Sequence, residues 1–565
     1  MSVSYEQKPW MAFYDDHVPE FLDYPEKLYS ERFQDIVRAM PDAVAVYYMD
    51  RPITYRELNR YADRFANFII SRGLVPGDVV GVNLPNLPAY YIAIQGIMKA
   101  GCVLSGVSPL LTPKELEYQL NDSGAKILVT LDLLFGKAAE VVAKTGVRSV
   151  LVAGISDFLP PVKKFLGKLL KKIPTGAVTE VPGVEVIRYM EALAGAEESP
   201  VLVQVGFGAP CLMQYTGGTT GPPKGAVLTQ KNVSWHVEQL KSWLNLDPGY
   251  GAAISAFPLF HQAGLFVGML CMAMGLNQVA VPNPRDLGFI VKNIKKYKPF
   301  GIINVPTIFL ELMKREDFRA LDFSSVNWFV SGAAPFPADY IVEFEKIVGK
   351  NKLVEVMGMT ETTPITTALP IYGKKKVGSV GIPISDTDVK VVDPATKEVV
   401  PVGEPGEMVV KGPQVFTIGY HNKPEETANT LRDGWIYTGD IVSMDEDGYF
   451  FVVDRAKDML IVSGYKVFTR TVDDVLMEHD DIDMAATIGL PDPKRPGSEL
   501  VASAIVLKKG VSADDAAKER IIAYMKEKVA PYKVPKVIEF MDELPMSAVG
   551  KILKRELRDS MAKKA

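Results

Sequence analysis

Cysteine is scarce in this chain of 565 residues, which contains only Cys102, Cys211 and Cys271. The three lie far apart, form no Cys-x-x-Cys pair, and each occurs in an apolar or glycine-rich stretch. Disulfide frameworks and zinc sites need paired or closely spaced cysteines. The pattern therefore predicts buried free thiols in a reducing compartment and excludes a disulfide-stapled protein.

An excess of positive charge is also missing, because 63 Lys and Arg residues face 68 Asp and Glu residues, for a net charge of −5. Nucleic-acid-binding proteins usually carry a basic field, so we expect no nucleic-acid partner. No uninterrupted apolar run reaches the roughly 18 residues of a membrane span, and the N-terminus lacks the apolar core of a signal peptide. We therefore expect a cytoplasmic protein.

What the chain does have is the balanced composition of a globular protein, with 47% apolar and 23% charged residues. Residues 45–150 and 251–330 alternate short apolar runs with helix-like stretches, which is typical of parallel α/β architecture. Short strands separated by turns predict a β-rich subdomain over about 376–453. We expect an α/β fold with an N-terminal domain of stacked subdomains over 1–455 and a small α+β C-terminal domain over 456–565.

The segment QYTGGTTGPPKGAVLTQKN, residues 214–232, is the densest functional signal. Glycine lets backbone N–H groups close on phosphate oxygens, while hydroxyl groups and an ammonium group add donors. A Walker A loop requires Gly-Lys followed by Ser or Thr, whereas this segment has Pro-Lys-Gly. An ordinary surface turn would not concentrate these residues, so we predict a phosphate cradle of another kind. Its expected members are Thr216, Gly217, Gly218, Thr219, Thr220, Gly221 and Lys224.

Together with six further motifs, this segment resembles the adenylate-forming enzymes, which include acyl-CoA synthetases, firefly luciferase and peptide-synthetase adenylation domains. The other motifs are FPLFHQAG, SGAAPFP, MGMTETTP, YTGD, DRAKDMLIVSGYKV and GKILKREL, in the order of the family. One motif would be weak support, but seven in order over residues 25–558 are specific. The resemblance implies ATP, Mg²⁺ and coenzyme A as cofactors, and a C-terminal domain that rotates between two half-reactions.

The MGMTE motif supplies a hydroxyl and a carboxylate. A hard carboxylate such as Glu361 can hold Mg²⁺ beside triphosphate oxygens, and the Thr360 hydroxyl can donate to the α-phosphate. The resemblance implies the same roles, although a lone acid after threonine is otherwise a common surface residue or cap. At the position of Met357 the family usually has a tyrosine that stacks on adenine. The polarizable sulfur of Met357 can also cover the adenine ring. The resemblance places further small or flexible residues around adenine and the acyl group: Gly332, Ala333, Ala334, Gly358 and Met359.

Three motifs in the last third of the chain supply charged residues. Asp440 and Arg455 are similar to the family's ribose-binding pair, in which a carboxylate accepts from the ribose hydroxyls and a guanidinium donates. Lys457 matches the position of the family's domain hinge, with a plain exposed lysine as the alternative. Lys551 matches the lysine whose charge would bridge the substrate carboxylate and the α-phosphate. The family's Pro-Lys-Thr before that lysine is replaced here by residues 545–547, Pro-Met-Ser.

Two motifs bear on the thiol substrate. By resemblance, His261 lines the acyl pocket and helps to gate access of the thiol. A histidine among Phe, Leu and Gly is otherwise more often a packed core residue. Gly464 is similar to the position that lets pantetheine pass the rotated domain, and Lys466 of the same SGYK motif is counted with it among the cofactor-binding residues.

The resemblance implies an AMP-forming acyl-CoA synthetase that acts on a small-molecule carboxylic acid. The segments HQAGLFVGMLCMAMG, VPTIF and SGAAPFP are apolar and offer no Asp for an amino group, which disfavours amino acids. A medium- or long-chain fatty acid suits these segments. The alternative is an alicyclic or aromatic acid–CoA ligase, whose reaction can also run in reverse. An adenylating enzyme that loads a carrier protein is a second alternative, and the intact charged residues disfavour a pseudoenzyme.

Residues 162–173 lie outside all these motifs and combine an apolar stripe with a cluster of lysines. A basic amphipathic helix can lie on an anionic bilayer, which would be a peripheral membrane contact. The commoner arrangement is a surface helix whose apolar stripe packs on the protein body, and this is what we expect. The family also suggests a homodimer. The stripe consists of Val162, Phe165, Leu166, Leu169, Leu170 and Ile173, and the lysines are Lys163, Lys164, Lys168, Lys171 and Lys172.

Overall fold

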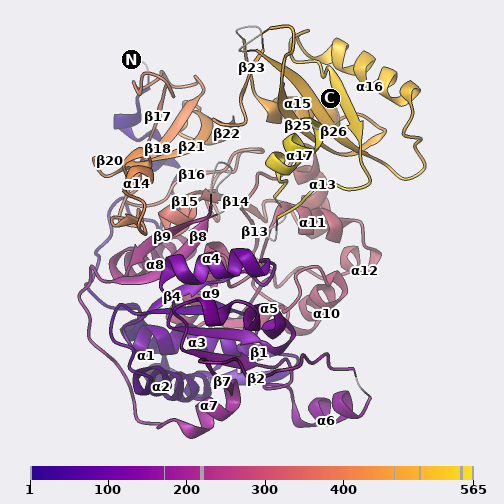
Figure 1. Ribbon diagram of the computed structural model, residues 1–565. Helices are drawn as coiled ribbons and strands as arrows, with labels where there is room; N and C mark the ends of the chain where they lie inside the picture. Colours follow the sequence, from indigo (N-terminus) through magenta and orange to yellow (C-terminus); the bar gives the residue numbers. More distant parts are fainter. Residues whose placement is uncertain are drawn as a thin grey trace.

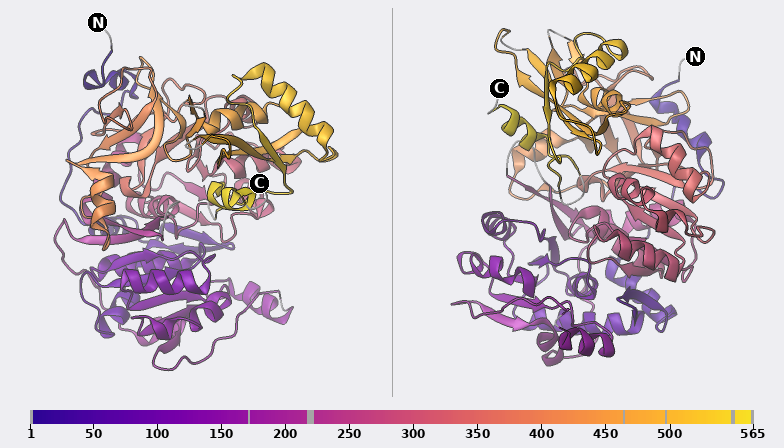
Figure 2. Two further views of the ribbon diagram at one scale, coloured as in Figure 1. Left: turned by 45° about the horizontal axis from the view of Figure 1, so that its top comes forward. Right: turned by 90° about the vertical axis from the view of Figure 1, so that its right-hand side faces the viewer.

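The computed structural model describes residues 3–170, 172–216, 222–462, 465–495, 498–547 and 551–562. Figure 1 shows most of the N-terminal half, in indigo to magenta, at the bottom of the molecule, while the N-terminus itself lies at the top beside the orange segment. The orange segment lies above it, and the yellow C-terminal segment packs beside the orange one (Figures 1 and 2). The α/β class predicted from the alternating pattern is confirmed.

A nine-stranded sheet forms one half of the N-terminal part, in the order β16-β15-β14-β13-β12-β10-β11-β1-β2. The run from β14 to β1 is parallel, so its strands are covered on both faces and consist largely of apolar residues. The strands are β1 Val44–Tyr48, β2 Arg51–Thr54, β10 Ala252–Ser255, β11 Asn277–Ala280, β12 Gly301–Asn304, β13 Trp328–Ser331, β14 Leu353–Gly358, β15 Ile365–Ala368 and β16 Ile382–Pro383.

An eight-stranded sheet forms the other half, in the order β19-β9-β8-β4-β3-β5-β6-β7. The late strand β19 joins the edge by pairing with β9, which brings residues near 420 beside the expected phosphate cradle. The strands are β3 Val79–Asn83, β4 Val103–Gly106, β5 Ile127–Leu131, β6 Ser149–Ala153, β7 Glu185–Arg188, β8 Pro210–Thr216, β9 Lys224–Thr229 and β19 Gly419–Tyr420.

Helices cover both sheets, and two of them lie deep in the core. Every residue of α3 is buried, and most of α9 is buried as well. A helix that is apolar all round belongs in an interior, which explains why these two lack a polar face. The helices of this part are α1 Tyr29–Ala39, α2 Tyr55–Ser71, α3 Pro88–Lys99, α4 Pro113–Ser123, α5 Phe135–Ala139, α6 Pro161–Leu169, α7 Tyr189–Gly195, α8 Gln230–Leu244, α9 Gln262–Met274, α10 Leu287–Tyr297, α11 Pro306–Met313, α12 Glu316–Arg319, α13 Ala338–Val348 and α14 Pro424–Thr430.

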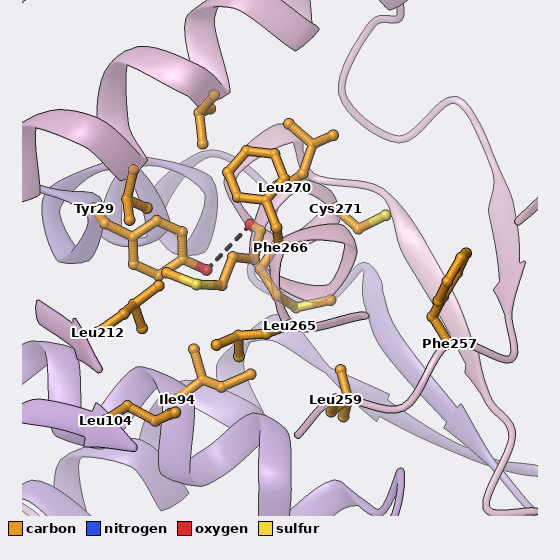
Figure 3. Close-up of a cluster of buried hydrophobic side chains, with 14 of the residues drawn as sticks. Tyr29, Ile94, Leu104, Leu212, Phe257, Leu259, Leu265, Phe266, Leu270 and Cys271 are labelled. Atoms are coloured by element: carbon orange, nitrogen blue, oxygen red, sulfur yellow. Dashed lines mark hydrogen bonds between the residues drawn. The ribbon is translucent and has the colours of Figure 1, made fainter. Parts of the chain in front are cut away.

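Figure 3 shows how α9 joins the segments around it. Leu265 and Phe266 of α9 lie among buried side chains from other elements, including Ile94 of α3 and Leu212 of β8. The hydroxyl of Tyr29 donates to the carbonyl of Met269 at 3.1 Å, so its one polar group is satisfied inside the cluster. All three cysteines are buried and free, which confirms the expectation from their spacing.

The expected β-rich segment forms a five-stranded sheet with β17, β18, β21 and β20 in order and β22 beside β21. The C-terminal part has a two-stranded and a three-stranded sheet, with apolar clusters of its own around α15, α16 and α17. The elements are β17 Asp388–Val392, β18 Gly406–Lys411, β20 Leu431–Arg432, β21 Trp435–Met444, β22 Phe450–Arg455, β23 Leu460–Val462, β24 Tyr465–Val467, α15 Thr469–Met477, β25 Ile482–Pro491, β26 Glu499–Leu507, α16 Asp515–Lys528, β27 Val537–Phe540 and α17 Lys554–Ala562.

Helix α6 corrects one expectation, because its apolar stripe does not pack on the body. Val162, Phe165 and Leu169 are each about two thirds exposed, at 68%, 68% and 67%. The helix contacts the body through Lys163 instead, which pairs with Asp50. Among the described residues, no helix combines the length and apolar character needed to cross a bilayer.

Candidate active site

The carboxyl ends of β12, β13 and β14 form the floor of the site. In parallel sheets these ends meet at one edge, where ligands commonly bind. The loop after β13 carries Gly332, Ala333 and Ala334, and a Cβ on Gly332 would lie 2.8 Å from Val356 Cγ2. Ala333 has a φ of 71°, so the backbone turns sharply there. The end of β14 supplies Met357 and Gly358, and Met359 leads into a short 3-10 turn, Thr360–Thr362.

Glu361 lies in that turn and is almost completely buried, with 3% of its surface exposed. Its Oε1 accepts a hydrogen bond from the hydroxyl of Tyr420. Burial raises the pKa of Glu361, while the Tyr420 hydrogen bond and the charges of Arg455 and Lys224 oppose that rise. The turn therefore holds one carboxylate away from solvent, within electrostatic reach of Arg455 and Lys224.

Lys224 opens β9 and lies opposite Thr216, the last residue of β8. Its ammonium group forms an ion pair with Glu426 and lies 5.3 Å from the centre of the Tyr420 ring. A phosphate that binds Lys224 must therefore compete with Glu426. The remaining members of the expected cradle, residues 217–221, lie outside the described residues.

Asp440 and Arg455 are cross-strand partners in β21 and β22. The Arg455 Nε forms an ion pair with Asp440 Oδ1 at 2.8 Å. Asp440 is buried, whereas the Arg455 side chain remains 44% exposed and can offer guanidinium N–H groups to a ligand. The pairing of β21 with β22 thus places the two predicted residues side by side. Their separation in the sequence does not show this.

Lys551 and Lys457 belong to a cluster of four cations with Lys224 and Arg455. Burial and the positive charges of Arg455 and Lys457 lower the pKa of Lys551 to about 8, while Asp440 and Glu361 oppose that shift. The pKa of Lys457 is also lowered, first by burial and then by Arg455, with Lys224 adding to the effect. Like charges at close range repel one another, so this cluster favours the binding of an anion.

The loop that carries Lys551 is closed by its own backbone. The Lys551 N–H donates to Ser547 Oγ at 3.0 Å, and the Ser547 N–H donates to the Lys551 carbonyl at 2.7 Å. Met546 forms a β-bridge with Ile552 on the same loop. The segment that replaces the family's Pro-Lys-Thr thus still supports the lysine on both sides.

His261 caps the N-terminus of α9 and lies within electrostatic reach of Lys551. Burial lowers its pKa to about 4, and the Lys551 charge acts in the same direction, so the ring is neutral near pH 7. Nδ1 accepts a hydrogen bond from the Ala263 N–H at 3.3 Å. The ring proton is therefore assigned to Nε2, which makes His261 a hydrogen-bond donor rather than a base.

A cavity of about 670 Å³ opens between the N-terminal part and the C-terminal segment. Phe257 and Pro258 of the FPLFHQAG motif line it, together with Val305 and Ile308 of the VPTIF segment. From the C-terminal side it is lined by residues 541 and 543–547, which lead into the Lys551 loop. No residue of α9 lines this cavity, because the apolar side chains of α9 are packed in the core.

The site gathers seven predicted residues within electrostatic reach of one another, and Thr360 precedes one of them in the short turn. The seven are Glu361, Lys224, His261, Asp440, Arg455, Lys457 and Lys551. Lys466 is not among them, since its nearest acidic partner is Asp393 Oδ2 at 4.0 Å in the β-rich sheet. Gly464 lies outside the described residues. Sequence reasoning missed Tyr420 and Glu426, for which no local pattern exists, because only the pairing of β19 with β9 brings them to Lys224.

Comparisons with known proteins show the family of the chain. The model of the AMP-binding enzyme family matches residues 33–421, and that of the AMP-binding enzyme C-terminal domain matches residues 471–551. A long-chain-fatty-acid–CoA ligase of Bacillus subtilis (strain 168) is 37% identical over 556 residues, 98% of each chain. A feruloyl-CoA synthase of Amycolatopsis sp is 35% identical over 524 residues, 92% of this chain and 96% of the relative.

Solved structures share the fold over nearly the whole chain. The crystal structure of ATP-bound MatB from Rhodopseudomonas palustris has a TM-score of 0.81 and 27% identity, over 95% of this chain and 99% of that chain. The crystal structure of the anthranilate CoA ligase AuaEII in complex with anthranoyl-AMP has a TM-score of 0.83 and 24% identity, over 97% of this chain and 98% of that chain. The arrangement of a large α/β part and a smaller C-terminal part is therefore shared with these proteins.

Proposed function

The chain belongs to the AMP-binding, adenylate-forming enzyme family as an acid–thiol ligase of its AMP-forming acyl-CoA synthetases, and we propose that it couples a long-chain fatty acid to coenzyme A. The observation that carries the proposed chemistry is the cluster of four cations near a buried carboxylate and the Asp440–Arg455 pair. Such a cluster suits a triphosphate, whose charge would offset the mutual repulsion of the cations.

In the first half-reaction, a carboxylate oxygen of the acid forms a bond to the α-phosphorus of ATP. The bond from that phosphorus to the bridging oxygen of the β-phosphate breaks, and pyrophosphate leaves. The acid and the α-phosphate are both anionic, so their approach is opposed by repulsion. Lys551, whose charge interacts with His261 and Arg455, would reduce this repulsion by neutralising both anions.

In the second half-reaction, the sulfur of coenzyme A bonds to the acyl carbon, the bond from that carbon to the phosphate oxygen breaks, and AMP leaves. Neither step forms a covalent bond to the enzyme, so this chain contributes positioning and charge. His261 cannot take the thiol proton while its Nδ1 accepts from Ala263, and instead presents its Nε2–H as a donor to the acyl oxygen. The thiol proton passes to solvent.

Glu361 is suited to hold Mg²⁺ with the phosphates of ATP. Mg²⁺ usually binds through one or two carboxylates, with the remaining ligands supplied by substrate phosphates and water. Among the described residues no group of three metal-binding side chains occurs, so an all-protein metal site has no support, whereas a single buried carboxylate fits this mode. When bound, Mg²⁺ would supply charge neutralisation for the triphosphate.

The acid would reach the site through the cavity beside Phe257 and Ile308. A volume of about 670 Å³ accommodates a long alkyl chain, and one end of the cavity meets the loop that carries Lys551. The relative from Bacillus subtilis, a long-chain-fatty-acid–CoA ligase at 37% identity, supports the same substrate class.

An aromatic acid is the second candidate. A feruloyl-CoA synthase is 35% identical over 92% of this chain, only slightly less than the fatty-acid ligase. Phe257, the one aromatic residue among the described residues that line the cavity, could also stack on a ring. The two candidates differ in the length of the acid that the enzyme should prefer.

The division at residue 455 and the hinge at Lys457 belong to the same proposal. Residues after Arg455 form a tight turn, in which the Asp458 N–H donates to the Arg455 carbonyl at 3.0 Å. Rotation about this turn would withdraw Lys551 from the site and bring the segment of Gly464 and Lys466 toward it for the second half-reaction.

Pyrophosphate release with ATP, Mg²⁺ and a panel of acids tests the proposal. The panel contains straight chains from acetate to octadecanoate, benzoate, ferulate, cyclohexane carboxylate and several amino acids, each with and without coenzyme A. We expect turnover only with coenzyme A and highest kcat/KM for long chains. A preference for ferulate would favour the second candidate, and release that is unaffected by coenzyme A would indicate a carrier-protein acceptor.

A further inference from the structure

Four polar residues connect the last helix, α17, to β22, the strand that precedes the hinge. Lys554, the first residue of α17, donates from Nζ to the Thr469 hydroxyl at 2.8 Å and pairs with Asp473 Oδ2 at 3.1 Å. The Thr469 hydroxyl donates in turn to Asp454 Oδ2 at 3.0 Å. Thr469, Asp473 and Asp454 are buried. Because a hydroxyl can accept from one group while it donates to another, these four residues form one continuous polar link.

The polar link crosses from the N-terminal part to the C-terminal part. Asp454 belongs to β22 of the five-stranded sheet, whereas Thr469 opens α15. The next residue, Arg470, adds a second hydrogen bond across the division, from Nη1 to the Val452 carbonyl at 2.9 Å. Both α15 and α17 pack on β25, so rotation about Lys457 would move them together and leave β22 behind. The contact of Thr469 with Asp454 therefore belongs to the orientation that the structure shows.

The charge of Lys554 is matched by carboxylates on both sides of the hinge. Burial lowers the pKa of Lys554, but nearby carboxylates outweigh this effect, so that the pKa is raised above its usual value. These carboxylates are Asp473, Asp454 and Asp458, of which the second precedes the hinge residue and the third follows it. A second cation of α17, Arg558, lies 3.9 Å from Asp458 Oδ1. Helix α17 is therefore held electrostatically to the hinge segment.

The polar link also fixes one end of the loop that carries Lys551. The Leu553 N–H donates to the Pro545 carbonyl at 2.8 Å, which closes the base of this loop, and Lys554 follows directly. Three residues of backbone span at most about 10 Å. The position of Lys551 is therefore limited by the place at which Lys554 is held, and through the polar link that place is set by β22.

We propose that Thr469 and Lys554 are positioning residues for the adenylation half-reaction. Through Asp454 they hold the C-terminal part in the orientation that presents Lys551 to the site. This role depends on the functions proposed above for Lys551 and for the hinge at Lys457. Loss of the polar link should weaken adenylation and spare the second half-reaction, because that step uses the rotated orientation.

The orientation of the C-terminal part can be measured without ATP or an acid. Spin labels on K411C and K526C, at exposed positions of β18 and α16, report the distance between the two parts by double electron–electron resonance. The three native cysteines are buried, so the labels attach to the introduced thiols. In this background T469V should shift or broaden the distance distribution, because valine keeps the shape of threonine but has no hydroxyl, and T469S should not. A distribution that T469V leaves unchanged overturns the proposal.

Kinetics separate the two half-reactions. In T469V, exchange of pyrophosphate into ATP with the most active acid of the panel should fall by about tenfold, the usual order for losing a hydrogen bond to a charged group. Thioester formation from supplied acyl adenylate should not change, and T469S should match the wild type in both assays. An equal loss in both half-reactions contradicts a positioning role. If the wild type exchanges with no acid, the proposed function fails, whereas the spin-label distances decide on the polar link separately.

Variants of Lys554 test the other end of the polar link. K554M should show the same selective loss as T469V, and K554R, which keeps a cation, should recover part of the exchange rate. The double variant T469V/K554M should lose no more than the larger single loss, because both residues act through one link, and fully additive losses would contradict this. The matched control is R555M, which removes a neighbouring cation that pairs with Asp559 of the same helix at 3.9 Å. An equal loss in R555M would overturn the assignment to Lys554.

Discussion

The low pKa of Lys551 predicts a pH dependence of adenylation, which tests whether the charge of this side chain matters. Burial, Arg455 and Lys457 bring this pKa from 10.5 to about 8, a change that corresponds to roughly 3 kcal/mol between the two protonation states. Because the folded-state pKa is lowered, the cation is present below pH 8 and is lost as the pH rises through that value. The kcat/KM of adenylation, which reports the free enzyme, should therefore fall on the alkaline side near pH 8.

Two substitutions test this assignment. K551A removes the charge and should slow adenylation by about 10²–10³-fold, the usual cost of one preorganised charge at a transition state. K551R keeps a cation that does not titrate in this range, so it should retain part of the activity and move the alkaline limb upward. K536A removes an exposed lysine of the C-terminal segment and serves as the matched control.

The assay is acid-dependent exchange of pyrophosphate into ATP for adenylation, and thioester formation from supplied acyl adenylate for the second half-reaction. We expect K551A to affect exchange far more than thioester formation. An equal loss in both half-reactions would refute the assigned role. An alkaline limb that stays near pH 8 in K551R would show that another group titrates there.

Three further changes test other parts of the structure. E361Q should raise the Mg²⁺ concentration needed for half-maximal pyrophosphate release, because an amide is a weaker ligand than a carboxylate; an unchanged Mg²⁺ dependence would reject Glu361 as the ligand. K457P should spare adenylation and slow thioester synthesis, because proline restricts the backbone of the turn. K457A removes the side chain but leaves the backbone free, so it serves as the control. Equal rates of thioester synthesis in K457P and K457A would show that the hinge lies elsewhere. D63A leaves Lys99, 1% exposed and 2.5 Å from Asp63 Oδ1, as an unpaired buried cation, so the free energy of unfolding should fall by about 3–5 kcal/mol. Thermal and denaturant unfolding measure this, and a double variant D63L/K99M that is no more stable than D63A would contradict the argument.

The active-site residues were easier to predict from sequence than their partners. Lys224, Glu361, Asp440, Arg455 and Lys551 stand in compact motifs whose residue types indicate phosphate, metal and ribose chemistry. The partners of these residues come from distant segments and carry no local signal. The Tyr420 hydroxyl reaches Glu361, and Glu426 reaches Lys224, only because β19 pairs with β9.

Some features of the fold can likewise be predicted from the sequence, and others cannot. Alternation of apolar runs and helical periodicity predicts the α/β class, since each strand and helix leaves its own period in the chain. The order of strands in each sheet has no such signature, because neighbours in a sheet need not be neighbours in sequence. The direction of α6 is a further case: periodicity identifies the apolar face of Val162 and Phe165, but the ion pair of Lys163 with Asp50 turns that face outward.

The class of fold, the local motifs and the chemical type of each candidate group can be predicted from the amino-acid sequence, because they depend on residues close together in the chain. Which groups meet depends on the three-dimensional fold. It brought four cations and a buried carboxylate into mutual range, lowered the pKa of Lys551 to about 8, and assigned the proton of His261 to Nε2. Electrostatic energy depends on distance and burial in space, and neither quantity is written in the linear order of residues.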